Sequence, residues 1–213
     1  HVPVIEYNPF EAVKTNVIGT QNIIDACLEQ NVEKVIGIGT DKAVSPLNTY
    51  GASKLLMEKL FVTAGNFMNP QRHRTKFITL RYGNVFGSSG SVIPLWINQI
   101  KNKDKISITD PQMTRFSIMM DEALDFIISA ATLGKGSEIF VPKIHAYTIM
   151  DLKNALTELL GNSEQQITGI RSGEKLHEIL INQDEMRYTW EFNDNYVIFN
   201  PMQSEFEIKE KYP

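Results

Sequence analysis

The fold is decided by residues 35–54, which read VIGIGTDKAVSPLNTYGASK. The stretch opens with an apolar run, residues 35–39, that lacks polar alternation, as is typical of a strand covered on both faces. A helical spacing of apolar residues follows from about residue 48 to residue 64. A strand, a short polar loop and a helix in this order predict an α/β fold, in which chemistry lies at the carboxyl ends of the strands.

The same alternation extends outward from this stretch in both directions. An amphipathic helix is predicted over residues 11–30, and a second buried strand over residues 77–82 leads into a glycine-rich loop at 83–90. Later in the chain the patterns predict strands at 106–109, 138–141 and 166–170, and helices at 92–101, 121–133, 148–160 and 175–180. This order predicts a doubly wound parallel sheet with right-handed crossovers, whereas residues 182–213 show little periodicity.

A complete dinucleotide-binding fold begins with a strand and a glycine-rich turn that holds the pyrophosphate. No such turn precedes residue 35, and the glycines at 83–90 come too late to replace it. We therefore expect a Rossmann-like fold whose amino-terminal βαβ part, roughly 80–90 residues, is missing. Residues 1–109 are expected to form the remaining Rossmann part with the catalytic residues. Residues 110–213 are expected to form mainly a small α+β substrate-binding portion, interleaved with the sheet near residues 119–143.

Composition and charge exclude several classes of partner. The 213 residues are 42% hydrophobic, enough to build a core. The net charge of −4, without a run of lysines and arginines, argues against nucleic acid and favours a small-molecule partner. The single cysteine, Cys27, fits a reducing cytoplasm, and no Cys/His cluster suggests a metal. No apolar run reaches the ~18 residues of a membrane span, so we expect this segment to be cytoplasmic unless an anchor lies elsewhere.

Tyr50 and Lys54 are one helical turn apart and so lie on one face of the predicted helix. An ammonium near a phenol lowers the pKa of the phenol, which lets a tyrosine exchange a proton with a substrate hydroxyl. Thr40, at the end of the preceding strand, brings a hydroxyl that can bind the same reacting oxygen. Taken alone, the Tyr-x-x-x-Lys pair is a weak signal, because an exposed helix pair has the same spacing. Asp41 and Lys42, an acid and a base next to Thr40, are further candidate site residues. The alternative interpretation is that they form an ion pair at the surface.

Thr40, Tyr50 and Lys54 together resemble the triad of the extended short-chain dehydrogenase/reductases, and Asn16 with residues 19–22 resembles the helix that precedes it. The sequence Thr-Asp-Lys-Ala at residues 40–43 is more specific. It is similar to the configuration-inverting UDP-N-acetylglucosamine 4,6-dehydratases of surface-glycan and flagellin-sugar pathways, whereas ordinary 4,6-dehydratases typically carry Thr-Asp-Glu. The resemblance extends along nearly the whole chain, through residues 6–9, 81–85, 113–116, 139–143 and 169–178.

The resemblance implies a carbon–oxygen lyase that binds NADP, with NAD as the alternative. Hydride would pass from C4 of the sugar to the nicotinamide and return to C6, while Tyr50 receives the C4 hydroxyl proton. Lys42 would act as the base at C5, with inversion there, and Asp41 as the acid that protonates the departing C6 hydroxyl. The cofactor-binding residues that the resemblance implies are Thr40, Tyr50, Lys54 and Asn16.

The implied substrate is UDP-N-acetylglucosamine or a related UDP-sugar. Arg115 and Arg171 are natural bidentate partners for its diphosphate, and Asn84 and Glu174 are the other expected substrate-binding residues. For the charged members of this set, the alternative is an interior or surface salt bridge.

Two other functions stay open at this point. A UDP-sugar 4-epimerase would use Tyr50 and Lys54 but leave Lys42 idle. A chain without the pyrophosphate turn would alternatively serve as an inactive sugar-nucleotide-binding module. In each case we expect a homo-oligomer with no nucleic-acid partner and no membrane contact in this segment.

Overall fold

The computed structural model describes residues 2–69 and 71–212. It divides the chain into two compact units. The first, here called the sheet unit, contains the residues up to Tyr82, Leu124–Lys143 and the residues from Ile179 onward. The second, the pocket unit, contains Gly83–Ala123 and Ile144–Glu178. Each unit is therefore built from segments that are far apart in the sequence.

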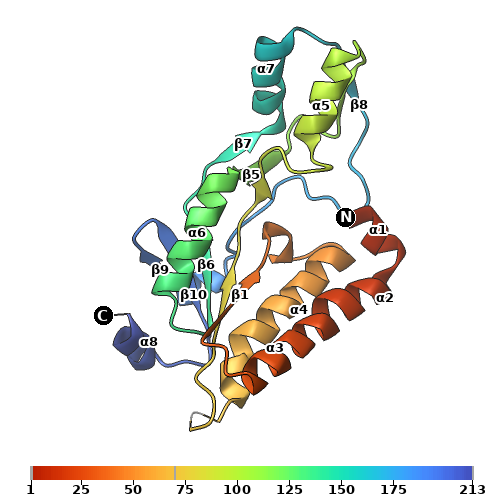
Figure 1. The fold of residues 1–213 in the computed structure, drawn as a ribbon. Coiled ribbons are helices and arrows are strands. Elements are labelled where there is room, and N and C mark those ends of the chain that lie inside the picture. Colours follow the sequence, from red (N-terminus) through yellow and green to blue (C-terminus); the bar gives the residue numbers. More distant parts are fainter. Residues whose placement is uncertain (1, 70, 213) are drawn as a thin grey trace. The chain divides into compact units, whose positions relative to one another are not determined.

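Within the described residues, the sheet unit is built on a five-stranded sheet with the order β1-β2-β6-β10-β9 (Figure 1). Its strands are β1 (Lys34–Ile38), β2 (Lys76–Leu80), β6 (Glu138–Pro142), β9 (Thr189–Phe192) and β10 (Asn195–Phe199). β1, β2 and β6 run parallel, with Val35 opposite Phe77 and Ile78 opposite Glu138. β2 and β6 each lie between two neighbours and are almost entirely buried, as is typical of strands covered on both faces.

Neighbouring residues of β2 contact helical segments on opposite faces of the sheet. Phe77 packs edge-to-face on Phe61 of α4 (Thr49–Ala64), with ring centroids 5.6 Å apart. Ile78 packs against Gly134, directly after α6 (Met120–Leu133), so closely that an added Cβ on the glycine would clash with its side chain. Because successive strand side chains alternate between faces, the two helices lie on opposite faces, as the predicted doubly wound fold requires.

The carboxyl-terminal region adds structure that periodicity did not predict. β10 runs antiparallel to both β6 and β9, so a hairpin extends the otherwise parallel sheet. The final helix, α8 (Glu205–Lys211), begins with a capping box between Ser204 and Glu207.

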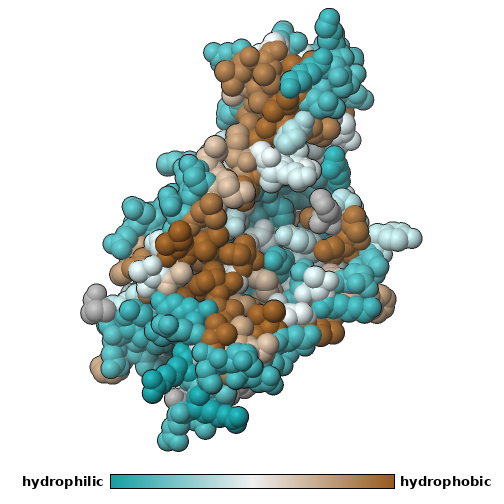
Figure 2. Space-filling model, in the orientation of Figure 1, coloured by the Kyte–Doolittle hydropathy of each residue, from teal (hydrophilic) through white to brown (hydrophobic). Residues whose placement is uncertain are grey.

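On the surface of the sheet unit, apolar side chains gather over α6 (Figure 2), where Leu124 and Ile128 are 52% and 65% exposed. In residues 2–69 and 71–212, no helix is both long and apolar enough to span a membrane.

The helix predicted over residues 11–30 is interrupted. The segment begins within α2 (Pro9–Ala12) and continues through a π-helical turn (Val13–Ile18) into α3 (Gly19–Glu29); the separate helix α1 (Val2–Tyr7) precedes it. At the end of the π-helical turn, the N–H of Gly19 donates to the carbonyl of Lys14, five residues back. Such turns insert one residue into a helix and are frequent at functional positions. Asn16 lies within this one.

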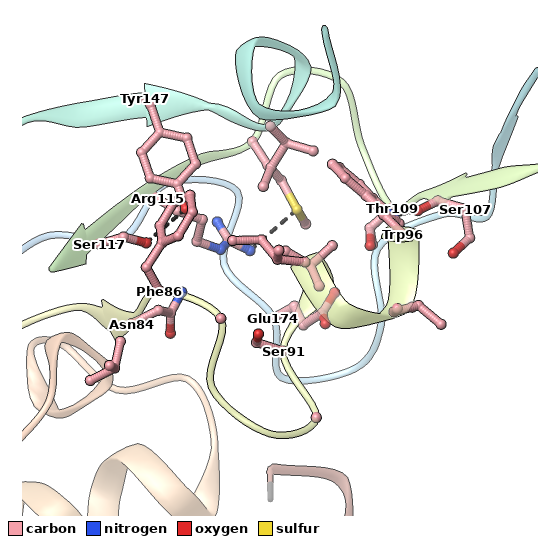
Figure 3. Close-up of a pocket in the computed structure, with 18 of the residues that line it drawn as sticks. Asn84, Phe86, Ser91, Trp96, Ser107, Thr109, Arg115, Ser117, Tyr147 and Glu174 are labelled. Carbon is pink, nitrogen blue, oxygen red and sulfur yellow. Dashed lines mark hydrogen bonds between the residues drawn. The ribbon is translucent and has the colours of Figure 1, made fainter. Parts of the chain in front are cut away.

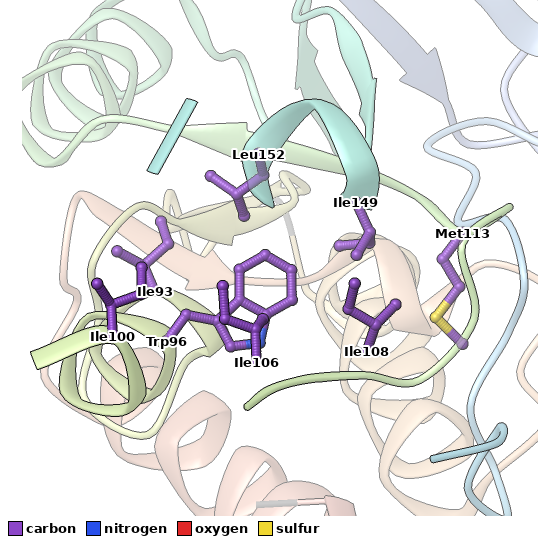
Figure 4. Close-up of a cluster of buried hydrophobic side chains, with 8 residues drawn as sticks. All are labelled: Ile93, Trp96, Ile100, Ile106, Ile108, Met113, Ile149 and Leu152. Atoms are coloured by element: carbon purple, nitrogen blue, oxygen red, sulfur yellow. The ribbon is translucent and has the colours of Figure 1, made fainter. Parts of the chain in front are cut away.

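The pocket unit combines small sheets with helices. Its elements are β3 (Asn84–Val85), α5 (Val92–Lys101), β4 (Ile106–Ile108), β5 (Thr114–Ile118), β7 (Ala146–Thr148), α7 (Ile149–Leu160) and β8 (Gln165–Ile167). β3, β5 and β7 form one sheet, and β4 pairs with β8. Buried apolar side chains cluster around Trp96 (Figure 4), which is 1% exposed. The indole N–H donates to the carbonyl of Ser107 at 2.8 Å, so the buried ring keeps its hydrogen bond.

The prediction of a helix over residues 175–180 is wrong. This segment is irregular, and it is attached to β5 because the N–H of Thr114 donates to the carbonyl of Leu176. Its apolar residues serve separate cores: Leu176 packs on the cluster around Trp96, whereas Leu180 packs on a cluster of the sheet unit. Helical spacing therefore arose here without a helix. The strand predicted at 166–170 is shifted to β8, and β5 and β7 were not predicted.

Candidate active site

The loop after β1 brings three predicted site residues into one turn. After Thr40 the chain forms a 3₁₀ turn at Asp41–Ala43, in which the N–H of Ala43 donates to the carbonyl of Thr40. The N–H of Asp41 donates to the carbonyl of Tyr82, just beyond β2, which fixes the turn against the neighbouring chain segment. Because the turn is tight, the side chains of Thr40, Asp41 and Lys42 converge instead of alternating as they would along a strand.

Asp41 is fully buried but only partly satisfied. Its Oδ1 accepts the Thr40 hydroxyl at 2.9 Å and the Lys42 ammonium at 3.0 Å. Its Oδ2 is buried without a hydrogen-bond partner among the described residues. A buried carboxylate oxygen in this state costs free energy unless a further donor reaches it, and a substrate hydroxyl is a donor of the right kind.

Tyr50 lies at the start of α4, where Asn48 caps the helix by accepting the N–H of Gly51 at 2.6 Å. Burial raises the pKa of the Tyr50 phenol above its ordinary value. The charge of Lys42 opposes this rise, Asp41 reinforces it, and a hydrogen bond with Thr40 opposes it again. The cation that lowers the pKa of Tyr50 is therefore Lys42.

Lys54, one helical turn after Tyr50, binds the backbone at the end of β1. Its ammonium donates to the carbonyl of Ile38 at 2.9 Å and lies 3.5 Å from Sδ of Met57. Burial lowers the pKa of Lys54, and the charge of Glu58 opposes that shift. Lys54 thus binds the last residue of β1, and Lys42 is a cation that lowers the pKa of Tyr50.

Gly51 allows the loop to pack directly on the first turn of α4. A Cβ at this position would clash with the carbonyl oxygen of Lys42 and would lie 2.9 Å from Cβ of Pro46. Glycine is therefore required for the approach that keeps Lys42 next to Tyr50. The sequence contains a signal for this contact. A glycine inside a helix lowers the helix propensity of the segment, so its presence indicates close packing at that position.

Asn16 is joined to the helix that carries Tyr50 and Lys54. Its side-chain Nδ2 donates to Oγ of Ser53 at 2.9 Å, and this hydroxyl donates to the carbonyl of Tyr50 at 2.8 Å. The π-helical turn thereby holds α4 at the level of the proposed catalytic tyrosine. Ser53, which was not predicted as a site residue, is 4% exposed and forms the link.

All four predicted substrate-binding residues line one cavity of the pocket unit (Figure 3). The cavity has a volume of about 260 Å³, and its lining includes Asn84, Arg115, Arg171 and Glu174. Further lining residues were not predicted as site residues: Phe86, Ser91, Trp96, Ser107, Thr109, Ser117 and Tyr147. Trp96 is both in the core and at the cavity. A concave site with aromatic walls and a few converging polar groups is typical of small-molecule binding.

Arg115 projects into this cavity without a carboxylate partner among the described residues (Figure 3). Its Nη1 donates to the carbonyls of Thr114 and Leu176 at 2.8 and 3.1 Å, and its Nη2 lies 3.2 Å from Sδ of Met113. These neutral acceptors orient the guanidinium but leave its charge uncompensated. A fixed, partly buried cation of this kind favours an anionic ligand.

Arg171 and Glu174 partner each other instead. Nη1 of Arg171 lies 3.8 Å from Oε1 of Glu174, and the N–H of Arg171 donates to the same carboxylate at 3.3 Å. The Arg171 side chain is 63% exposed, so this ion pair contributes little stability. On the other side of the cavity, the hydroxyls of Ser117 and Tyr147 lie 2.7 Å apart. Tyr147 lies on β7, a strand that the sequence pattern did not reveal.

Relatives of this chain include two curated enzymes. The UDP-N-acetylglucosamine 4,6-dehydratase (inverting) of Campylobacter jejuni is 48% identical over 199 residues, which are 93% of this chain and 58% of the relative. A UDP-glucose 4-epimerase of Rickettsia felis is 44% identical over 186 residues, 87% of this chain and 54% of the relative. The chain thus spans a little more than half the length of these relatives.

Structural and family comparisons point the same way. The crystal structure of Pen from Bacillus thuringiensis is 41% identical and superimposes with a TM-score of 0.88, covering 96% of this chain and 64% of that one. This agreement confirms the predicted Rossmann-like α/β fold. The family described as polysaccharide biosynthesis protein matches residues 1–200. The chain therefore belongs to the polysaccharide biosynthesis protein family.

Proposed function

We propose that the protein containing this chain is a configuration-inverting UDP-N-acetylglucosamine 4,6-dehydratase, a carbon–oxygen lyase. The observation that carries the proposal is the Asp41–Lys42 ion pair, 3.0 Å between Oδ1 and Nζ, beside Tyr50. Dehydration needs an acid and a base in addition to the tyrosine that serves oxidation at C4, and this cluster contains both. The similarity to the Campylobacter jejuni dehydratase supports the same assignment.

The ion pair has the composition that both proton transfers require. Transfer of one proton from the Lys42 ammonium to the Asp41 carboxylate, whose Oδ1 lies 3.0 Å from Nζ, would yield the free amine and the protonated acid that the reaction requires. The amine then takes the proton from C5, and the acid gives its proton to the departing C6 hydroxyl, which leaves as water. The pair returns to its charged form when these two transfers are complete. Reduction at C6 also requires a proton at C5, and its delivery to the opposite face of the sugar inverts that centre.

Oxidation at C4 and reduction at C6 are the chemistry that a bound nicotinamide dinucleotide supplies. We propose NADP, with NAD as the alternative, held by Thr40, Tyr50, Lys54 and Asn16. These residues fit such a group. The Lys54 ammonium has three N–H donors, of which one binds the Ile38 carbonyl and one contacts the Met57 sulfur, so a third donor is left for the cofactor. Tyr50 would receive the C4 hydroxyl proton, with Thr40 hydrogen-bonded to its phenol.

The cavity of the pocket unit would hold the UDP-sugar. Arg115 would bind the diphosphate, because its charge has no counter-ion among the described residues and its orientation is set by backbone carbonyls. Asn84, Arg171 and Glu174 would add polar contacts from the same lining. The aromatic rings of Phe86 and Tyr147 offer apolar surface to a nucleotide base.

A UDP-sugar 4-epimerase is the second candidate, and the similarity to the Rickettsia felis epimerase favours it. It would need Tyr50 but neither Asp41 nor Lys42 as acid and base. The buried, unpartnered Oδ2 of Asp41 argues for the dehydratase, since an epimerase leaves that oxygen without a use. We further propose that the protein is cytoplasmic and that it forms a homo-oligomer. Size-exclusion chromatography with light scattering tests the oligomeric state.

One incubation distinguishes these functions. The intact protein is mixed with UDP-N-acetylglucosamine and NADP in deuterated water, and the products are examined by NMR and mass spectrometry. The dehydratase yields a 6-deoxy-4-keto sugar with deuterium at an inverted C5. A 4-hydroxy epimer that keeps its C6 oxygen would establish the epimerase, and saturable binding without turnover would leave only a binding module.

A further inference from the structure

Arg81, directly after β2, is fully buried between two carboxylates of the sheet unit. Its Nε and Nη2 donate to Oε1 and Oε2 of Glu58 at 3.2 and 2.6 Å, a bidentate pair with both side chains 0% exposed. Its Nη1 and Nη2 also donate to the two carboxylate oxygens of Glu185, each at 2.9 Å. One guanidinium thus binds two carboxylates; burial raises the pKa of Glu58, and the charge of Arg81 opposes that rise.

The cluster lies directly behind the proposed catalytic residues of the sheet unit. Glu58 follows Lys54 by one helical turn on α4 and therefore shares its face of the helix. Its Oε1 packs against Gly39, where an added Cβ would lie 2.7 Å from that oxygen. Gly39 separates Ile38, whose carbonyl accepts the Lys54 ammonium, from Thr40. Glu58 thus contacts the backbone on which both Lys54 and Thr40 depend.

The carboxyl-terminal segment completes the cluster. Nη1 of Arg81 donates to the carbonyl of Leu180 at 2.9 Å. Glu185 is held in turn, because its carboxylate accepts the N–H of Asn182 at 3.1 Å and its own N–H donates to the Asn182 side chain at 2.9 Å. Residues 180–185 are therefore bound to the end of β2 through one guanidinium group.

The proposed reaction uses none of these three charged side chains. Replacing a buried ionic cluster by apolar residues of similar volume is often neutral or stabilising, so folding stability alone does not account for one. We propose that Glu58, fixed by Arg81, is a positioning residue that supplies the counter-charge of Lys54, and that Glu185 couples the carboxyl-terminal segment to it. This inference rests on the proposed function, since it concerns the residue that would hold the cofactor there.

The electrostatics of the sheet unit agree with this assignment. Burial lowers the pKa of Lys54, and the Glu58 carboxylate opposes that loss, which helps the ammonium keep its proton. Burial also disfavours the charge of Arg81, but Glu58 and Glu185 outweigh burial and raise the pKa of Arg81 above its usual range. The guanidinium therefore stays charged and keeps Glu58 in place.

Other titratable side chains lie on the elements packed around Lys54. They are Tyr50 on α4, Asp41 and Lys42 on the loop after β1, and Arg81 and Glu185 behind Glu58. Among the described residues, Glu58 is the charged side chain that shifts the pKa of Lys54. A change at Glu58 is thus expected to be felt at Lys54 directly.

The test is the pH dependence of reductive methylation at Lys54, measured by mass spectrometry on the intact protein with and without Glu58→Gln. Loss of the counter-charge is expected to move the midpoint for Lys54 to lower pH, so that methylation below the midpoint becomes several-fold faster. A purely structural role predicts the opposite sign, because a loosened helix would rehydrate Lys54 and move its midpoint upward toward that of an ordinary lysine. An unchanged or raised midpoint would overturn the proposal.

Glu138→Gln is the matched control. Glu138 is also a buried carboxylate of the sheet unit, but its Oε1 accepts the N–H groups of Lys135 and Gly136 at 2.5 and 2.7 Å, at the beginning of β6. This variant is expected to leave the Lys54 midpoint in place, and an equal shift there would contradict a specific role for Glu58.

A second variant covers the case in which Glu58→Gln does not fold. Glu185→Gln removes a carboxylate, 13% exposed, that raises the pKa of Glu58; Glu58 then keeps its charge more firmly, so the Lys54 midpoint is expected to rise. No shift in this variant would overturn the coupling. The measurement needs neither substrate nor cofactor, so it remains decisive for the counter-charge even if the protein proves not to be a dehydratase.

Discussion

At the residue scale, Lys42 is the side chain that separates dehydration from simple oxidation at C4. Lys42→Ala removes the amine that would take the C5 proton but leaves Tyr50 and Thr40 in place. We expect wash-in of solvent deuterium at C5 to disappear and the dehydratase kcat to fall by about a hundredfold or more, the usual contribution of an acid–base group. Deuterium exchange in single turnovers, followed by NMR, is the measurement.

Lys42→Arg is the control for this experiment. It keeps a positive charge beside Asp41, but an arginine does not give up its proton in proteins and cannot serve as a base. Loss of exchange in both variants would identify proton abstraction as the function of Lys42. Exchange that persists in the alanine variant would remove Lys42 from the mechanism.

The pH dependence of Tyr50 tests which lysine acts on it. Burial raises the pKa of its phenol above the ordinary value of 10.0, while the charge of Lys42 opposes the rise. Lys42→Met is therefore expected to move the alkaline midpoint of Tyr50 still higher, whereas Lys54→Met leaves it nearly unchanged. Ultraviolet difference titration against Tyr50→Phe gives the midpoint. A larger effect from Lys54→Met would reverse the assignment.

The same shift has a consequence for stability. Since the phenol of Tyr50 binds its proton more tightly in the folded chain than in the unfolded chain, its contribution to the free energy of unfolding is present below the ordinary value of 10.0. This contribution is lost as the pH rises through the folded pKa. Tyr50→Phe should therefore lose less stability than the parent protein between neutral and strongly alkaline pH, as followed by urea unfolding.

At the scale of elements, the packing of the catalytic loop on α4 depends on the absence of a side chain at Gly51. Alanine is favoured over glycine inside a helix by about 1 kcal/mol. The Cβ would, however, clash with a backbone oxygen, of Lys42, which cannot rotate away. Overpacking of this kind costs ~1–3 kcal/mol, so we expect Gly51→Ala to lower the free energy of unfolding and to reduce kcat.

Gly19 provides the matched control for Gly51. Its nearest neighbour for an added Cβ is the carbonyl oxygen of Lys14 at 3.4 Å, which is an ordinary contact. Gly19→Ala should therefore leave stability unchanged or raise it by up to about 1 kcal/mol. Urea unfolding of the two variants decides the matter, and equal stability changes would show that the loop contact at Gly51 is unimportant.

These two glycines also show why elements were easier to predict than their junctions. The helix of α4 and the strands β1 and β2 follow from local apolar spacing, which the sequence displays directly. The 3₁₀ turn at Asp41–Ala43 depends on a hydrogen bond to Tyr82 and on the contact at Gly51, both set by tertiary packing. The effect of Lys42 on Tyr50 arises at that junction, and helical spacing does not reveal it.

At the scale of the whole molecule, the predicted residues fall into two groups that belong to different units. Thr40, Asp41, Lys42 and Tyr50 were found because they are close in sequence, and the sheet unit gathers them. Asn84, Arg115, Arg171 and Glu174 come from separate segments, and they were found through the family resemblance rather than through spacing. The hairpin β9–β10 and the buried contact of Glu185 with Arg81 escaped prediction because nonlocal pairing leaves no helical or alternating pattern.

This division predicts that binding and chemistry can be impaired separately. Arg115→Lys keeps the charge but loses the planar group that two backbone carbonyls orient, so we expect UDP binding to weaken about tenfold. Arg171→Lys should have a smaller effect, because Arg171 is 63% exposed and already pairs with Glu174. Calorimetric titration of the intact protein with UDP measures both. Lys42→Ala should bind UDP as the parent does, and equal losses in the two arginine variants would mean that the missing counter-ion of Arg115 does not mark the diphosphate site.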